Sequence, residues 1–131
     1  MLKAMIPADV LERKGAIIKS FEVGEIIYGE GSGAHYYYQI ISGRVRLSNF
    51  LEDGKEVLHN VLVGHDCFGE VAIFEAGNHL VTAIADSACV LLRLRAIDFV
   101  ALLEEEPIYH AHFMQLVSKD LRFKLFITKL I

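Results

Sequence analysis

The sequence has few of the residues that build several common kinds of site. Only two of its 131 residues are cysteine, Cys67 and Cys89. Two cysteines alone supply neither a zinc site nor an iron–sulfur cluster. Both lie in apolar, strand-like segments, where a free cysteine packs as a small hydrophobic residue. We therefore expect both cysteines in the core rather than in a disulfide or a redox centre.

Long apolar runs are also missing. Although 53% of the residues are hydrophobic, no stretch of about eighteen consecutive apolar residues occurs, so a membrane span is not expected. The first residues, 1–7, contain no apolar stretch of signal-peptide length. A cytoplasmic location follows, for a chain whose length suits one domain with a substantial core.

Positive charge is absent from a long internal stretch. No Lys or Arg occurs between Lys55 and Arg93, and the net charge is −4. Attraction to nucleic acid is therefore not a property of the whole chain. Four basic residues gather near the C-terminus, where we interpret them as the solvated face of a helix: Lys119, Arg122, Lys124 and Lys129.

No catalytic or metal-binding pattern is recognisable. His110 and His112 lie two apart on a predicted helix, so they point in different directions. Neither a Ser–His–Asp set nor a carboxylate pair stands out. Four other histidines are scattered without the spacing of metal ligands: His35, His59, His65 and His79. We predict neither catalysis nor a metal site, and a metal-dependent cupin enzyme is the least favoured alternative.

Glycine divides the chain into short apolar runs. Nine of the ten glycines lie between residues 24 and 77, which is typical of an all-β roll, barrel or sandwich. We predict one mainly β domain with flanking helices. It comprises a helical segment in 1–16, an eight-stranded β-roll of the jelly-roll type in 17–95, and helices in 96–131.

Several strands can be predicted individually. Residues 44–48 alternate polar and apolar side chains, and Asp53-Gly54 indicates a hairpin. The returning strand, 57–63, would place Val57, Val61 and Val63 on one face. Aromatic and β-branched residues predict a strand over 36–41. Two later strands, 81–85 and 89–94, are expected to pair across Asp86-Ser87.

The segment after Arg95 is predicted to be helical. Asp98 is expected to cap a first helix, which closes before Pro107. A second helix would run from about 108 to the end, with an apolar surface wider than one stripe. We expect part of it to pair with a second copy of the chain, giving a two-fold dimer, through Phe113, Val117, Leu121 and Leu125. The chain ends on Leu130-Ile131 without a capping residue, so we expect it to be the front part of a longer protein.

One short segment is unusual in its chemistry. Residues 67–74 place a Gly-Glu pair of exposed type, Gly69-Glu70, between apolar residues directly after a strand. Such a turn presents backbone N–H groups and one carboxylate to a small ligand.

Order and spacing now resemble the cyclic nucleotide-binding domain, in the style of the sensor halves of CRP/FNR-type transcription regulators. The resemblance rests on Ile26-Ile27, Gly31 and the run 36–45, on the segment 68–73, and on the long terminal helices. It covers most of 17–131. It implies a β-roll, a homodimer through the last helix, and DNA contact only through a helix-turn-helix domain outside this chain.

The resemblance also implies roles for particular residues. Gly69 would donate a backbone N–H, and Glu70 would accept from a ribose hydroxyl. The peptides of Val71 and Ala72 would turn toward a cyclic phosphate. An arginine that clamps the phosphate would follow, and Thr82, at the start of the next strand, is expected to contact the ligand as well. Lys124 falls near the positions that contact the base in relatives, where it either reaches an anion or faces water.

The expected arginine is missing. Depending on the alignment, His79 or Leu80 stands in its place, and neither offers the permanent bidentate charge of a guanidinium. The effector implied by the resemblance is cAMP or another cyclic nucleotide. The alternatives for the ligand are a different small molecule, or none if the pocket is degenerate. The alternatives for the domain are a haem or redox sensor of the same fold, using Cys67 or His79, and a cyclic-nucleotide domain attached to a kinase or channel.

Overall fold

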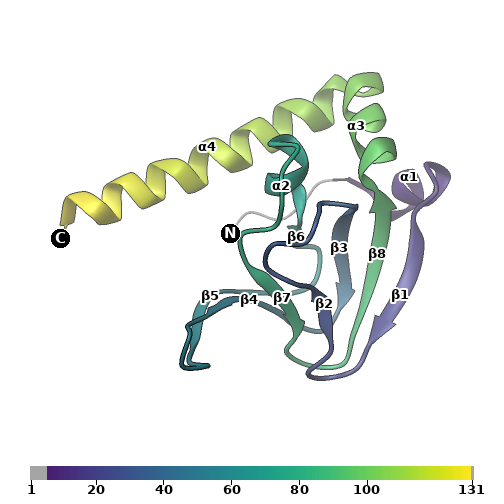
Figure 1. Ribbon diagram of the computed structural model, residues 1–131. Coiled ribbons are helices and arrows are strands. Elements are labelled where there is room, and N and C mark those ends of the chain that lie inside the picture. Colours follow the sequence, from purple (N-terminus) through teal and green to yellow (C-terminus); the bar gives the residue numbers. More distant parts are fainter. Residues whose placement is uncertain (1–5, 131) are drawn as a thin grey trace.

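The computed structural model describes residues 6–130. Within this range it contains eight strands and four helices (Figure 1). In chain order these are α1 (Ala8–Arg13), β1 (Ile17–Phe21), β2 (Ile26–Tyr28), β3 (Tyr36–Ser42), β4 (Val45–Phe50), β5 (Glu56–Leu62), β6 (Cys67–Phe68), α2 (Glu70–Phe74), β7 (Thr82–Ala85), β8 (Cys89–Arg95), α3 (Ala96–Glu105) and α4 (Pro107–Leu130). The predicted helical positions 1–5 and 131 lie outside the described residues.

The strands form two antiparallel four-stranded sheets, in the orders β1-β8-β3-β6 and β2-β7-β4-β5. The predicted eight-stranded β-roll with a long C-terminal helix is confirmed. Successive side chains of a strand point to opposite faces, so the first sheet serves two cores. Tyr38, Phe68 and Leu91 point between the sheets. Tyr37, Cys67 and Leu92 point the other way, against α1, α3 and α4.

Two tight turns, one between β3 and β4 and one between β7 and β8, pack directly against each other. Gly43 follows β3 with a φ of +91°, and a Cβ built there would lie 2.4 Å from the Ala88 carbonyl oxygen. The Arg44 carbonyl accepts hydrogen bonds from the backbone N–H groups of Asp86 and Ser87. At both turns the chain passes from one sheet to the other, from β3 to β4 at Gly43 and from β7 to β8 at residues 86–88. The predicted pairing of β7 with β8 is wrong, because residues 86–88 carry the chain into the other sheet.

Strand β5 departs from its predicted alternation. Its register against β4 shifts between Leu47 and Ser48, so one residue of β5 is extra and the side-chain parity inverts. Val57 faces Asn49, whereas Val61 faces Arg46. The prediction that Val57 and Val61 share a face is therefore wrong. The irregularity matters for the site below, because this part of β5 lines it.

The two last helices follow the prediction in extent but not in capping. Helix α3 ends one residue before Glu106, close to the predicted stop. Arg95 is its N-cap, and Asp98 lies in the first turn, where its carboxylate pairs with the Arg95 guanidinium at 2.8 Å. Helix α4 passes α2 and then projects beyond the roll (Figure 1). Among the described residues, no helix combines the length and apolar character that crossing a lipid bilayer requires.

Candidate functional site

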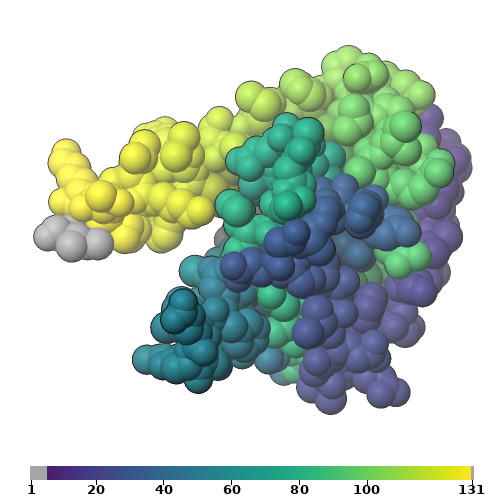
Figure 2. Space-filling view, in the orientation of Figure 1, coloured from purple at the N-terminus to yellow at the C-terminus, as the bar shows by residue number. Residues whose placement is uncertain are grey.

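A cavity of about 820 Å³ opens between the roll and α4. Figure 2 shows the hollow between the projecting end of α4 and the β4–β5 hairpin. Three parts of the chain form most of its walls: β6 with α2, the strands β4 and β5 together with residues 78–81, and one side of α4. The residues that carry its polar chemistry are Asn49, His59, Asn60, Glu70, Glu75, Asn78, His79, Asp120 and Lys124. Of the segment singled out in the sequence, 67–74, residues 67–72 line the cavity without a gap, whereas Ile73 and Phe74 do not line it.

Gly69 ends β6 and starts α2 in a conformation that favours glycine. Its φ is +90°, in the left-handed region. A Cβ at this position would lie 3.0 Å from the Tyr36 carbonyl oxygen and 3.7 Å from the His79 ring. The backbone therefore needs glycine here both for its conformation and for its close approach to β3. This turn fixes where the next residue, Glu70, points.

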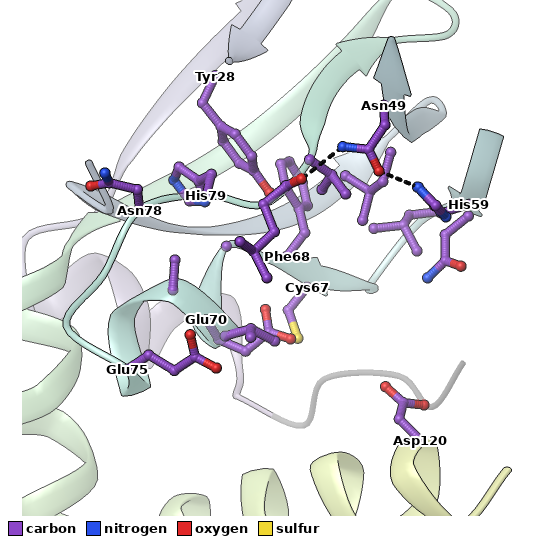
Figure 3. Close-up of a pocket in the computed structure, with 18 of the residues that line it drawn as sticks. Tyr28, Asn49, His59, Cys67, Phe68, Glu70, Glu75, Asn78, His79 and Asp120 are labelled. Carbon is purple, nitrogen blue, oxygen red and sulfur yellow. Dashed lines mark hydrogen bonds between the residues drawn. The ribbon is translucent and has the colours of Figure 1, made fainter. Parts of the chain in front are cut away.

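Glu70 is not the exposed residue that the sequence indicated. Its Oε2 atom is buried and has no hydrogen-bond partner among the described residues. Burial raises the pKa of the Glu70 carboxyl; a hydrogen bond with its own backbone N–H opposes this shift, and the nearby Asp120 carboxylate adds to it. Figure 3 shows Glu70 beside Cys67, with Asp120 on α4 across the cavity. A buried acceptor without a partner is unusual and favours a donor from a ligand.

His79 lies in the site but is not presented as a cation. Its side chain is 5% exposed and stacks on Tyr28 with ring centroids 3.6 Å apart. Burial lowers the pKa of the imidazole, and His35 adds to the effect. His79 is therefore neutral near pH 7 and cannot supply the permanent charge of an arginine. Leu80, the other position considered, is 70% exposed at the cavity wall and brings no charge.

Of the two predicted ligand-binding residues Thr82 and Lys124, only Lys124 lines the cavity. Thr82 is not among the lining residues. Its hydroxyl oxygen accepts a hydrogen bond of 3.0 Å from the backbone N–H of Glu30 and so ties the 29–31 turn to β7. The expectation of a ligand contact from Thr82 is not met, because that oxygen points to the turn. Lys124 does line the cavity, from an exposed position on α4.

A polar group on the hairpin side was missed by the sequence analysis. The Asn49 side-chain amide donates to the Leu80 carbonyl at 2.8 Å and to the Glu30 carboxylate at 2.7 Å. Its oxygen contacts the His59 ring (Figure 3). The shift in β5 brings consecutive residues, 59–62, to the cavity. No alternation pattern predicts that, and Asp120 and Phe123 likewise enter only because α4 docks here.

The thiol of Cys67 lies in the lining but is unreactive in character. The side chain is buried, and burial together with the Glu70 carboxylate raises the pKa of the thiol. Cys67 and Cys89 are both free, buried cysteines, as the sequence predicted. Among residues 6–130 no group of three or more His, Cys, Asp or Glu side chains is arranged to hold a metal ion.

The predicted dimer residues separate into two groups on α4. Phe113 is 1% exposed and packs edge-on against Tyr37 and Phe99. It therefore belongs to the core of its own chain, and its assignment to the interface is wrong. Val117, Leu121 and Leu125 are 42%, 56% and 62% exposed.

Comparisons with known proteins agree on the kind of domain. The model of the cyclic nucleotide-binding domain matches residues 18–106. The chain is 32% identical over 78 residues to a CRP-like cAMP-activated global transcriptional regulator of Mycobacterium tuberculosis, which is 60% of this chain and 33% of that protein. It is 28% identical over 99 residues to the cyclic AMP receptor protein of Thermus thermophilus, 76% of this chain and 46% of that one.

The solved Catabolite Activator Protein of Thermus thermophilus has the same fold, with a TM-score of 0.84 and 24% identity, over 93% of this chain and 57% of that one. The chain thus spans 33% and 46% of the length of the two curated relatives.

Proposed function

This chain belongs to the cyclic nucleotide-binding domain family, and we propose that it is the effector-sensing and dimerisation module of a CRP/FNR-type transcription regulator. A small effector binds in the cavity beside residues 69–72. Two copies associate through α4, and the DNA contacts belong to a helix-turn-helix domain outside these residues. A regulator of this kind acts in the cytoplasm. The two curated relatives are named a transcriptional regulator and a cyclic AMP receptor protein.

One observation supports this function above the others: a single helix serves both the cavity and the exposed apolar surface. Asp120, Phe123 and Lys124 of α4 line the cavity. Val117, Leu121 and Leu125 lie along the same helical segment and are exposed. An effector that contacts α4 therefore stabilises one placement of the helix over others. Such differential contact is what a population shift requires.

The exposed residues of α4 suit a second copy of the same helix. Val117, Leu121 and Leu125 recur every four residues, so they form one stripe along α4. A two-fold arrangement places the same stripe of both copies in contact. Exposed apolar stripes of this length on a projecting helix mark protein contacts.

Sedimentation equilibrium tests the dimer. We expect a dimer at tens of micromolar, and a monomer for Leu121→Glu, because the substitution puts a carboxylate in the apolar contact. Gln115→Glu is the matched control, since Gln115 is an exposed residue of the same helix away from the stripe. A wild-type monomer, or equal loss of the dimer in both variants, would contradict the proposal.

A further inference from the structure

We propose that the effector is an uncharged ribonucleoside, and that a phosphate group on it weakens binding. The inference rests on the proposed function, because it takes the cavity at Glu70 to be the effector site. It concerns what the residues of this chain select rather than what the relatives are named for. Three features of the cavity support it: its charge, its buried acceptor and its apolar wall.

The charge of the cavity opposes an anion. Glu70, Glu75 and Asp120 line it, and Lys124 is the one Lys or Arg among its described lining residues. His79 is buried against Tyr28 and neutral. Arg93, the first Lys or Arg after Lys55 in the sequence, lies over the Tyr36 ring at 4.1 Å from its centroid and is not part of the lining. A phosphate would enter a site with three carboxylates and one exposed ammonium, where like charges repel.

The buried acceptor asks for a hydrogen-bond donor. Glu70 Oε2 has no partner among the described residues although it is shielded from water. Leaving such an oxygen unpaired is costly, and a donor that reaches it recovers that cost. Ribose hydroxyls donate hydrogen bonds, whereas phosphate oxygens only accept them at neutral pH. The sugar of a nucleoside therefore satisfies Glu70, and a phosphate cannot take its place there.

The remaining wall suits a flat, weakly polar ring. Val71, Leu80 and Phe123 are exposed apolar residues that line the cavity. Asn60 and Asn78 add amide groups that can donate to or accept from the edge of a base. The cavity, at about 820 Å³, lies within the usual range for small-ligand sites, roughly 300–1,000 Å³. A purely cationic amine would meet Lys124 at the α4 wall and leave the apolar surface uncovered.

Isothermal titration of the full chain with matched ligands tests the inference. The probes are adenosine, guanosine, cytidine and uridine, each paired with its 3′,5′-cyclic phosphate. We expect at least one nucleoside to bind, and to bind about tenfold or more tightly than its cyclic phosphate, given the like-charge repulsion. The 2′,3′-dideoxy form of the nucleoside that binds should bind about ten- to a hundredfold more weakly, since it cannot donate to Glu70.

Three variants separate the causes. Glu70→Gln should lower nucleoside affinity by about tenfold or more, whereas Glu104→Gln, at an exposed position on α3 outside the cavity lining, should leave it unchanged. Leu80→Arg adds a guanidinium at an exposed lining position, and it should tighten cyclic nucleotide binding relative to nucleoside binding, because only the cyclic nucleotide carries a phosphate that the guanidinium can pair with. Thermal melts confirm that each variant is folded.

Two results would overturn the inference. One is a cyclic nucleotide that binds as tightly as its nucleoside or more tightly, which would leave the proposed sensor function intact. The other is no binding by any of the eight probes at millimolar concentration. Sedimentation of the same samples judges the dimer separately, so failure of the ligand class and failure of the module are distinguishable.

Discussion

The imidazole of His79 lies flat against the phenol ring of Tyr28, with centroids 3.6 Å apart and an angle of 11° between the planes. The pair sits at the wall of the cavity, and both residues line it. Stacking and backbone hydrogen bonds hold His79 in place: its N–H donates to the Ser32 carbonyl at 2.9 Å, and its carbonyl accepts from the Gly31 N–H at 2.8 Å. This arrangement gives His79 a structural role in the neutral form.

The pH dependence of stability should reveal that role. Burial lowers the pKa of folded His79, so below about pH 6.5, the value in an unfolded chain, unfolding takes up a proton. Stability from this residue is therefore lost as pH falls from about 6.5 through the lower folded value. His79→Phe keeps a stacking ring without titrating. Urea unfolding between pH 7.5 and 5 should show a steeper loss for wild type, by up to about one proton; parallel curves would contradict this account.

The contribution of Glu70 to the pH dependence of stability should have the opposite sign to that of His79. Burial raises the pKa of its carboxyl in the folded chain, so the folded protein holds the proton longer than the unfolded one. Its contribution to stability is present below about pH 4.3 and is lost as pH rises through the higher folded value. We expect Glu70→Gln to be more stable than wild type at pH 7 without ligand, and the difference to disappear near pH 4. A variant less stable than wild type at pH 7 would show that the carboxylate has a stabilising partner.

Gly43 should tolerate no side chain. Gly43→Ala would force a positive φ on alanine and place its Cβ 2.6 Å from that of Cys89. Gly54→Ala is the matched control, because Gly54 has a φ of +87° with no atom within 4 Å of the added Cβ. Chemical denaturation should give a loss of about 1–2 kcal/mol for Gly54→Ala and a further ~1–3 kcal/mol from overpacking for Gly43→Ala. Equal losses of unfolding free energy in the two variants would contradict this account, because they would mean that the turn at Gly43 moves away from Ala88 and Cys89 to make room for the added Cβ.

Phe113 should matter to the folding of a single chain. Its ring is 1% exposed and meets Tyr37 and Phe99 edge-on. Phe113→Ala should cost about 3–5 kcal/mol of unfolding free energy. Phe126→Ala, at a 57% exposed position on the same helix, should change it by less than about 0.5 kcal/mol. Denaturation at a concentration where the chain is monomeric makes the comparison; similar losses for both would place Phe113 outside the core.

The sequence predicted what local patterns encode. Alternation over 44–48 and the aromatic run over 36–41 correspond to observed strands. The family inferred from the 68–73 segment together with the upstream residues and the terminal helices is confirmed. The sequence did not predict which sheet each strand joins. That assignment depends on the close contact between the turns at Gly43 and Ala88, where the chain passes from one sheet to the other.

The cavity shows the same limit. Gly69 to Ala72 are contiguous in sequence and were predicted to lie together, and all four line it. Phe113 and Leu121 belong to the same four-residue repeat along α4, so the sequence does not distinguish them. Docking of the helix on the roll buries Phe113 and leaves Leu121 exposed. Asn49 and His59 depend on the register shift between β4 and β5, which no residue type in the strand announces.

Hydrogen exchange of the full chain tests most directly the claim that occupancy of the cavity is felt by α4. The measurement compares the free chain with the chain saturated by adenosine, by the other three nucleosides and by their cyclic phosphates. We predict that each probe that binds slows exchange in 67–75 and in 117–125 together, because both segments border one cavity. Protection confined to the β-roll, with exchange across 117–125 unchanged, would contradict the account.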